Sequence, residues 1–502
     1  MKAVILISYI ISAILFIVGI KKLGKVNTAR QGNFLSSIGM LIAIVATIFM
    51  LVPEGNKLSQ NMVYIVIIGI ALGTIIGVIS ATKVSMTAMP EMVAIFNGFG
   101  GGASALVASA ELLKFLGDKK SYLINLIKSN PTFKFSDSML DKMYYSQLFE
   151  IIHFDLNTTM ITIVLSVIIG SLTFTGSFIA WGKLQGKISG QPITYPGQNI
   201  INLLILLGVI IAAYFFVVNP ENMTAFYVIV CVGLLLGVLS VIPIGGADMP
   251  VVISLLNSYS GIAAAATGFV LQNQALIVSG CLVGASGIFL TNIMCKGMNR
   301  SLGNVLFSAF GKVDATSTGP KSAVGIIIKE MSADNAAYTM QAAESVIIVP
   351  GYGMAVAQAQ HEVRKLADEL EKEGVDVKFA VHPVAGRMPG HMNVLLAEAN
   401  IAYDKLFDMD EINDDFAGAD VALIIGANDV VNPAARHDQS SPIYGMPILN
   451  VDHAKTTFVL KRSMNPGFAG ISNELFGYDN NYMVFGDAKA TVSQFVETLK
   501  EE

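Results

Sequence analysis

Charged residues are scarce in this chain and make up 14% of its 502 residues. A soluble globular domain usually carries about 25%. No charge lies between Phe34 and Pro53 or between Ile200 and Asn219, whereas charges become frequent after Lys321. Together with 53% hydrophobic residues, this distribution excludes a wholly soluble protein and predicts membrane-spanning segments followed by a water-exposed C-terminal part. The formal net charge of −5 gives no reason to expect a nucleic-acid partner.

Cysteine is scarce as well, with three residues at Cys231, Cys281 and Cys295. All three lie in apolar stretches, without a C-x-x-C pair and without a histidine at the spacing of a metal site. This pattern argues against a disulfide framework and against a metal centre. We expect three small, buried hydrophobic side chains in a reducing or lipid setting.

The first apolar run lacks the features of a cleaved signal peptide. It holds 18 uncharged residues from Ala3 to Ile20, which is longer than a usual signal-peptide core. Lys21, Lys22 and Lys25 follow in place of a cleavage site with small residues. The run is therefore predicted to be a first transmembrane helix with its N-terminus outside.

Nine segments have the roughly 20 mostly apolar residues that a spanning helix needs. They lie near residues 3–20, 34–52, 62–80, 88–112, 158–182, 200–218, 223–243, 248–270 and 274–295. Nine spans place the C-terminal part on the cytoplasmic side of the plasma (inner) membrane. Basic residues at the inner ends agree with this orientation, namely Lys21, Lys22, Lys25, Arg30, Lys183, Lys187, Lys296 and Arg300. The loop near 113–157 agrees less well, because it is expected outside and carries six lysines.

The fourth and eighth spans resemble each other. Met89-Pro90 is followed by Asn97, Gly101 and Ala103, and at an offset of 160 residues Met249-Pro250 is followed by Asn257, Gly261 and Ala263. We interpret this as a parallel repeat about an axis along the membrane normal. Chance similarity between two helices rich in small residues is the alternative.

Polar groups inside a membrane are functional candidates. Asn97 and Asn257 occupy matched positions, and Glu91 and Asp248 lie near the cytoplasmic ends of the same two spans. We hypothesise that these four residues link a path through the membrane to the C-terminal domain. Ser104 and Thr175 are weaker candidates, because a hydroxyl often bonds its own helix backbone.

The composition divides the chain into three regions. These are a transmembrane domain at 1–299, a linker at 300–321 rich in Gly, Ser, Thr and Asn, and a C-terminal domain at 322–502. The last region alternates short apolar runs with amphipathic stretches, which is typical of an α/β domain with a parallel sheet.

A glycine motif follows the first expected strand, 345–349. Gly351 and Gly353 precede a helix whose apolar positions are expected at Val356, Ala359, Val363, Leu366 and Leu370, with Gly374 where the helix would end. The arrangement meets the dinucleotide fingerprint G-x-G-x-x-G/A loosely, because Val356 stands at its third position. The first glycine would make the tight turn and the second would let the backbone approach a pyrophosphate. A glycine turn without a ligand is the alternative. The motif favours a Rossmann-like domain.

The expected second strand, 377–381, indicates which dinucleotide is bound. NAD sites usually place an Asp or Glu after this strand, whereas here the segment 382–387 has no carboxylate. A 2′-phosphate would instead need cations, and Lys461, Arg462 and Ser463 follow the expected strand 456–460. This favours NADP, although a solvated surface pair would look the same.

A further strand at 421–425 ends in Gly426, Ala427, Asn428 and Asp429. Ligands of such folds bind beyond the carboxyl ends of the strands. Asp429 could orient a carboxamide, or it could cap the turn that follows. The acidic run at 408–415 is read as a solvated helix face, because no histidines accompany it.

These segments together resemble the β subunit of the proton-translocating nicotinamide nucleotide transhydrogenases. The resemblance is carried by 351–360, 382–393, 408–416, 425–434, 461–465 and 485–489, and in the membrane part by 245–250, 257–261 and 294–296. It covers nearly the whole chain. Nothing is carried over to the loop near 113–157, which looks expanded.

The resemblance implies a division of labour between subunits. A partner α subunit would bind NAD(H), and this chain would bind NADP(H) in a flipped orientation, within a dimer of αβ units. The expected nucleotide contacts are Gly351, Tyr352, Gly353, Met354, Val356, His382, Ala385, Gly386, Arg387, Gly426, Ala427, Asn428 and Asp429. The 2′-phosphate would meet Lys461, Arg462 and Ser463, and the segment Gly486–Asp487 would help to close over the nucleotide. The implied function couples hydride transfer between NADH and NADP⁺ to proton translocation.

The sequence departs from the family pattern at two places. Many members have a histidine in the fourth span where this chain has Asn97, and none of the six histidines lies inside a span, His153 being nearest. Because asparagine cannot titrate, we expect a histidine on the partner subunit to carry the proton. Phe468 stands where the family often has tyrosine, which puts a hydroxyl role there in doubt.

Two other functions agree less well with the sequence. A channel or carrier regulated by a nucleotide would usually show an acidic residue after the second strand, and a potassium channel would show a Thr-Val-Gly-Tyr-Gly filter; the sequence has neither. A membrane-anchored dehydrogenase acting alone would need a second nucleotide motif and a catalytic acid–base pair, and neither is evident.

Overall fold

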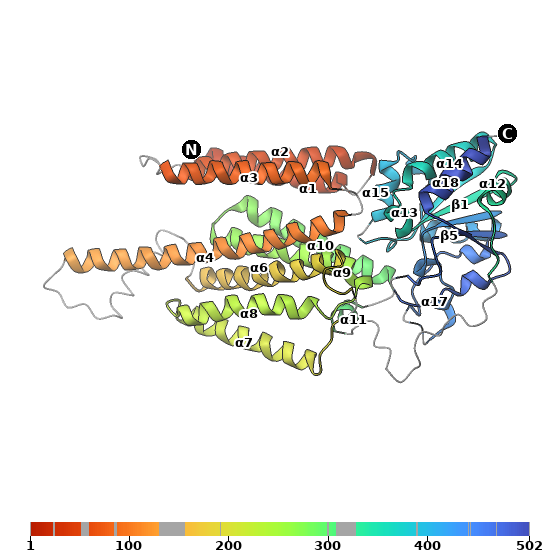
Figure 1. Ribbon diagram of the computed structural model, residues 1–502. Helices are drawn as coiled ribbons and strands as arrows, with labels where there is room; N and C mark the ends of the chain where they lie inside the picture. Colours follow the sequence, from red (N-terminus) through yellow and green to blue (C-terminus); the bar gives the residue numbers. More distant parts are fainter. Residues whose placement is uncertain are drawn as a thin grey trace.

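The computed structural model consists of a bundle of long helices with an α/β domain at one end (Figure 1). It describes residues 2–23, 26–51, 60–84, 88–129, 156–190, 192–298, 301–307, 328–387, 390–439, 441, 443–467 and 469–500.

Within these ranges nine helices are long and apolar enough to span a membrane. They are α1 (Lys2–Leu23), α2 (Val26–Leu51), α3 (Gln60–Lys83), α4 (Met89–Ser129), α6 (Leu156–Leu184), α7 (Gln198–Val218), α8 (Met223–Val241), α9 (Met249–Val270) and α10 (Gln274–Gly297). Each overlaps one predicted span, so the prediction of nine spans is confirmed. Helices are the expected form, because in lipid the backbone must satisfy its own hydrogen bonds.

The fourth span is longer than predicted. A loop was expected from about residue 113, but α4 continues to Ser129. The segment 103–129 contains no proline and a single glycine, Gly117, and it is rich in the good helix formers alanine, leucine and lysine. The Lys114–Glu111 ion pair, 2.9 Å long, adds a stabilising contact one turn apart. The rest of the predicted loop, with His153, lies outside the described residues.

The burial expected for the cysteines is corrected. Cys231 and Cys281 are exposed on the surface of the bundle, and of the three cysteines Cys295 alone is buried. The predicted linker contains a short helix, α11 (Leu302–Phe307), whose Val305 packs against Val251 of α9. Val305 is therefore buried against the helix bundle. Much of the predicted linker lies outside the described residues.

The two helices of the predicted repeat lie side by side and begin at the end of the bundle that faces the α/β domain (Figure 1). Asn97 Nδ2 on α4 donates to Ile253 O on α9 at 3.2 Å. A Cβ on Gly101 would lie 2.8 Å from Gly170 O of α6, and a Cβ on Gly261 would lie 2.5 Å from Gly284 N of α10. Each matched glycine therefore lets its helix approach the next helix closely, which supports the repeat.

The α/β domain contains one parallel sheet with the order β3-β2-β1-β4-β5-β6. Its strands are β1 (Ser345–Pro350), β2 (Asp376–Val381), β3 (Leu406–Asp408), β4 (Val421–Ile425), β5 (Thr456–Lys461) and β6 (Asn481–Phe485). The fold class predicted from the sequence is confirmed. The central strands are apolar along their whole length because both faces of the sheet are covered.

Alternate residues of β1 belong to the two cores of this domain. Val346 and Ile348 pack with α12 (Ala333–Gln341), α14 (Gln360–Lys372), α15 (His391–Glu398) and α18 (Ala488–Lys500). Ile347 and Val349 pack on the opposite face with Phe416 and with the short helix α16 (Met409–Ile412). The acidic side chains of the run 408–415 are exposed, as expected. In the described part of the chain, no group of His, Cys, Asp or Glu residues could hold a metal ion.

Candidate functional site

Most of the predicted nucleotide contacts gather at one edge of the sheet. Gly351, His382, Gly426 and Lys461 stand at or directly after the carboxyl ends of β1, β2, β4 and β5. The neighbours β1 and β4 lie where the strand order reverses direction, since the chain proceeds from β1 to β2 on one side and from β4 to β5 on the other. Doubly wound sheets bind their ligands in the crevice at this point.

The loops after β1 and β4 touch through their backbones at this point. Gly351 N donates to Ile425 O and Gly353 N donates to Gly426 O, both at 2.9 Å. A Cβ on Gly351 would lie 2.3 Å from Ala427 N, and a Cβ on Gly426 would lie 2.4 Å from the Cα of Gly353. Gly426 also has a φ of 68°, which favours glycine. These glycines are required for the contact between the loops, and the Gly353 amide is used within the protein. The predicted approach of Gly353 to a pyrophosphate therefore stays a prediction.

The helix expected after the glycine motif is divided in two. A short α13 (Tyr352–Val356) is followed by Gln358 with a φ of 50° before α14 begins. Ala359, Val363, Leu366 and Leu370 are buried as predicted. Val356 is 42% exposed, which corrects its assignment to the apolar face, because α13 ends there.

A chain of hydrogen bonds connects the loops after β4 and β5. Lys461 Nζ donates to Asn428 Oδ1 at 3.0 Å, and Asn428 Nδ2 donates to Asp429 Oδ1 at 2.9 Å. Lys461 Nζ also donates to Asn465 O at 2.8 Å and lies 4.8 Å from the centre of the Phe476 ring. Burial lowers the pKa of the Lys461 ammonium, while the nearby Asp429 acts in the opposite direction. The carboxylate and the ammonium are thus held in fixed places at the crevice.

The basic cluster predicted at the end of β5 is divided. Lys461 is half-buried and turned toward Asn428, whereas Arg462 and Ser463 are exposed. The loop after β6 lies next to this cluster, because Gly486 N donates to Lys461 O at 3.0 Å. Asp487 Oδ1 accepts from the amides of Lys489 and Ala490, so its carboxylate caps α18.

His382 has an internal role. It is 1% exposed, its Nε2 lies 2.8 Å from Pro447 O, and its Nδ1 accepts from Val384 N at 3.2 Å. Burial lowers the pKa of this imidazole to about 4, so the ring is neutral near pH 7. Because Nδ1 accepts, the proton lies on Nε2 and is donated to Pro447. Both nitrogens are engaged, which leaves no polar atom of His382 for the predicted nucleotide contact.

Arg387 contacts both the loop after β1 and the membrane helices. Its guanidinium carbon lies 4.5 Å from the centre of the Tyr352 ring. Its Nη1 donates to Leu184 O, the last residue of α6, at 3.1 Å and lies 3.9 Å from Glu91 Oε1 on the first turn of α4. The sequence predicted Arg387 as a nucleotide contact, and its connection to Glu91 and Leu184 was missed.

His391 was also missed as a candidate. It is fully buried at the start of α15, its Nδ1 accepts from Arg387 N at 3.0 Å, and its ring centre lies 6.2 Å from that of Tyr352. Ala385 is buried beside this turn, and Gly386 has a φ of 111°. A Cβ on Gly386 would lie 2.5 Å from His391 Nδ1. The sequence offers no spacing that would have revealed this packing.

The predicted membrane residues are divided between α4 and α9. Asn97 is buried, Asn257 is half-buried, and Asp248 is buried at the start of α9. Asn97 bonds α9 through Ile253 O, as described above, whereas Glu91 lies beside Arg387. The structure places Glu91 and Asp248 at or beside the ends of their helices that face the α/β domain (Figure 1).

Two hydroxyls, on α6 and α9, form a buried cluster with a backbone carbonyl of α4 that the sequence did not reveal. Ser166 Oγ and Thr267 Oγ1 lie 2.6 Å apart, and Ser166 Oγ lies 3.2 Å from Ser104 O. The Ser104 hydroxyl donates to Gly100 O of its own helix, as predicted. Thr175 differs from the prediction, because its shorter hydrogen bond, 2.7 Å, goes to Leu234 O of α8.

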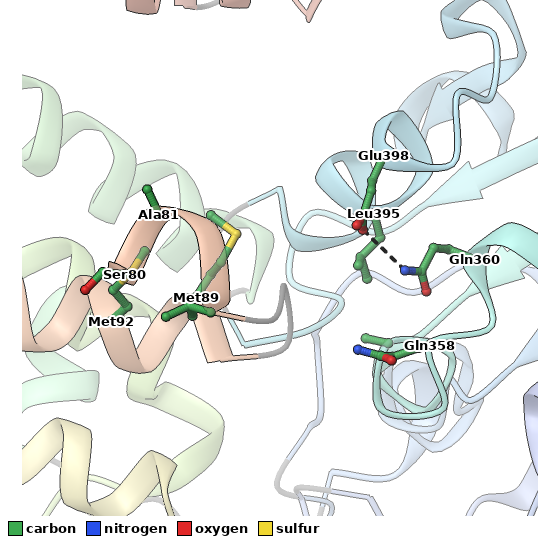
Figure 2. A pocket seen from close by; sticks show the side chains of 10 residues that line it. Ser80, Ala81, Met89, Met92, Gln358, Gln360, Leu395 and Glu398 are labelled. Carbon is green, nitrogen blue, oxygen red and sulfur yellow. Dashed lines mark hydrogen bonds between the residues drawn. The ribbon is translucent and has the colours of Figure 1, made fainter. Parts of the chain in front are cut away.

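A cavity of about 390 Å³ lies between the membrane helices and the α/β domain. Figure 2 shows Ser80, Ala81, Met89 and Met92 on its membrane side and Gln358, Gln360, Leu395 and Glu398 on the other. Gln360 Nε2 donates to Glu398 Oε2 at 3.2 Å. The first turn of α4 therefore faces the α/β domain in two ways. Glu91 lies beside Arg387, and Met89 and Met92 line the cavity between the two parts.

Comparisons with known proteins agree with one another. A family model described as NAD(P) transhydrogenase beta subunit matches residues 5–498. Two curated relatives from Rhodospirillum rubrum, each named NAD(P) transhydrogenase subunit beta, are 46% identical to this chain over 492 residues. The match covers 98% of this chain and 98% of each relative.

Proposed function

Because the chain belongs to the NAD(P) transhydrogenase beta subunit family, we propose that it binds NADP(H) in the crevice between β1 and β4. It is an integral, multi-pass membrane protein and works with an α-subunit partner. In the proposed division of labour the partner presents NAD(H), and the helices of this chain couple hydride transfer to proton movement. A nucleotide-regulated channel is not favoured by family membership.

The observation that carries the proposed site is the hydrogen-bonded line Lys461–Asn428–Asp429 at the topological switch point. It offers a cation, an amide and a carboxylate within one crevice. Bound NADP⁺ would supply a nicotinamide ring that accepts a hydride. The Asp429 carboxylate lies on the loop after β4, where it can orient a carboxamide. These donors and acceptors fit a nicotinamide nucleotide.

Selectivity for NADP is proposed to come from the end of β5. Arg462 and Ser463 are exposed, and the half-buried Lys461 lies beside them. A guanidinium forms bidentate hydrogen bonds with a phosphate, and a serine hydroxyl adds a donor. After β2, where NAD sites place a carboxylate, this chain has the buried His382.

Direct hydride transfer requires the reacting carbons of the two rings to lie about 3–3.5 Å apart. The chain therefore has to present its ring toward the partner and exclude water while transfer occurs. Gly486–Asp487, bonded to the end of β5 and to α18, is proposed to close the site. Because the two carriers have similar potentials, coupling must appear as different nucleotide affinities in two states of the protein.

The membrane part is proposed to set these states through Asn97, Asn257, Asp248 and Glu91. Asparagine cannot carry a proton as histidine does, so the titrating group is proposed to lie on the partner. The α/β domain is proposed to face the cytoplasm from the plasma (inner) membrane, and two αβ units are proposed to form the complete assembly.

The test is hydride exchange between NADH and an oxidised NADP analogue. The purified chain is assayed alone and together with a candidate α subunit. The proposal predicts NADPH-type product with both subunits and none with either alone. Full activity of this chain alone, or nucleotide binding without any exchange when both are present, would overturn it.

A further inference from the structure

Arg387 joins three separate elements at the boundary between the membrane helices and the α/β domain. It stacks on Tyr352, the residue after Gly351, donates to Leu184 O at the end of α6, and faces Glu91 on α4. The guanidinium thus connects the loop that begins the proposed nucleotide crevice to the ends of two membrane helices.

The ion pair between Arg387 and Glu91 is largely shielded from solvent. The side chains of Arg387 and Glu91 are 24% and 18% exposed. Removing a pair from water strengthens its charge interaction. The carboxyl end of α6 also carries a partial negative charge that attracts the guanidinium, and the aromatic ring of Tyr352 adds a cation–π contact. Glu91 and Leu184 O therefore fix Arg387, and Arg387 in turn fixes the Tyr352 ring.

Tyr352 is rigidly connected to the proposed nucleotide site. Gly351 and Gly353, the residues on either side of it, donate to Ile425 O and Gly426 O. Asp429 follows three residues after Gly426. A shift of Tyr352 is thus transmitted directly to the loop that carries Asn428 and Asp429.

The boundary has room for such a shift. The cavity of about 390 Å³ is lined by Met89 and Met92, which stand on either side of Glu91 in the sequence, and by Ala355 of α13. Figure 2 shows open space between the two methionines and Gln358 at the end of α13. Met354 and Ala355 anchor α13 in the core of the α/β domain, whereas on the side of the cavity the stacking of Arg387 on Tyr352 reaches α13 from the membrane helices.

We propose that Glu91 is a positioning residue that acts through Arg387 and Tyr352 to set how tightly the chain holds NADP(H). Loss of the Glu91 charge loosens Arg387, frees the Tyr352 ring and lets the loops after β1 and β4 move apart. This inference rests on the proposed function, because it assigns regulation to the same site.

The experiment is a double-mutant cycle on the complete αβ enzyme with E91Q, R387Q and the variant that carries both changes. The NADPH release rate and the KM and kcat for hydride transfer are measured. Each single change is expected to alter the release rate about tenfold, within the usual range of coupling between sites. The double variant is expected to show the same tenfold change, because both substitutions break one connection.

The matched control is a cycle on Glu362 and Lys365, an ion pair within α14 whose atoms lie 2.9 Å apart. E362Q and K365Q are expected to leave NADPH release unchanged. E91D retains the charge and should recover most of the wild-type rate, which loss of a purely structural contact would not explain.

Additive effects, with about a hundredfold change in the double variant, would overturn the inference. The inference would also be overturned if E91Q released NADPH at the wild-type rate, or if E91D and E91Q changed the release rate equally. If E91Q fails to assemble, R387Q and R387K are compared instead: R387Q is expected to change the release rate about tenfold, and wild-type release in R387Q would overturn the inference. Failure of the proposed function itself is distinct, because wild-type enzyme would then bind no NADPH.

Discussion

Asp429, on the loop after β4, accepts a hydrogen bond from the backbone amide of Ala469, on the loop after β5, with 2.9 Å between Oδ2 and N. Its other oxygen accepts from Asn428 Nδ2 at 2.9 Å, and Asn428 in turn accepts from Lys461. The Asp429 carboxylate is therefore the final acceptor of a hydrogen-bond chain in which Lys461 donates to Asn428 and Asn428 donates to Asp429.

Asp429→Asn should break this chain, because an amide nitrogen at 429 would face a donor at either position. A hydrogen bond to a charged group contributes about 1.5–3 kcal/mol. We expect a rise of roughly 10- to 100-fold in the Kd for NADP⁺ and depressed transhydrogenation. Calorimetric titration measures the first. Asp420→Asn, at the opposite edge of the sheet, is the control, and equal affinity in the Asp429 variant would refute the role.

Gly426→Ala should destabilise the α/β domain. Its Cβ would lie 2.4 Å from the Cα of Gly353, and its φ of 68° is unfavourable for alanine. The atoms nearest to this Cβ belong to the backbone and cannot move aside as a flexible side chain can. We therefore expect the free energy of unfolding to fall by about 1–3 kcal/mol or more. Thermal unfolding measures the loss. Gly418→Ala provides the control, since a Cβ there meets nothing within 4 Å; similar stability of the two variants would contradict the account.

Arg462→Ala should weaken NADP⁺ binding and leave NAD⁺ binding unaffected, because the exposed guanidinium is proposed to meet the 2′-phosphate. The expected loss in affinity for NADP⁺ is about 10- to 100-fold, as for a lost charged hydrogen bond. Competition binding with both nucleotides measures the selectivity. Lys372→Ala, on the surface of α14, should change neither affinity. An unchanged preference in the Arg462 variant would move the phosphate site elsewhere.

The buried His382 predicts a pH dependence of stability. Its pKa is lowered by burial from 6.5 to about 4, so the unfolded chain binds a proton more readily than the folded one. The stabilising effect of the neutral ring is complete above pH 6.5 and is lost as the pH falls toward 4, by an amount on the order of 3 kcal/mol. His382→Gln should flatten the stability profile in this range. A profile with an unchanged slope would show that folding does not shift the pKa of His382.

Asn257→Leu should uncouple nucleotide exchange from pH. Asn257 is half-buried on α9, at the position that matches Asn97 of α4 in the proposed repeat. The leucine would remove this polar group from the membrane part. NADP(H) exchange is measured against pH in reconstituted vesicles, with proton pumping followed in parallel. Unchanged pumping would remove Asn257 from the pathway.

The sequence predicts what depends on local patterns. Continuous apolar runs identified the nine spans and four of the strands, because burial on both faces of a parallel sheet requires such runs. Gly351 and Gly353 were recognised from the dinucleotide fingerprint and Gly426 from its place after a strand, whereas their close backbone contact with one another was found in the structure. The extension of α4 to Ser129 was missed because its lysines were read as loop residues.

What depends on contacts between distant segments could not be predicted. His382 is bonded to Pro447, 65 residues away, and Arg387 reaches Leu184, 203 residues away. Nothing near either residue in the sequence indicates these partners. The hydroxyl cluster of Ser166 and Thr267 was missed for the same reason, because single serines and threonines are common in membrane helices.

Equilibrium binding of NADP⁺ and NAD⁺ to the purified full-length chain, without any partner, tests the central claim most directly. The account predicts one NADP⁺ per chain, a much weaker interaction with NAD⁺, and loss of the NADP⁺ preference in Arg462→Ala. Equal affinity for both nucleotides, or tighter binding of NAD⁺, would contradict the assignment of NADP(H) to this subunit.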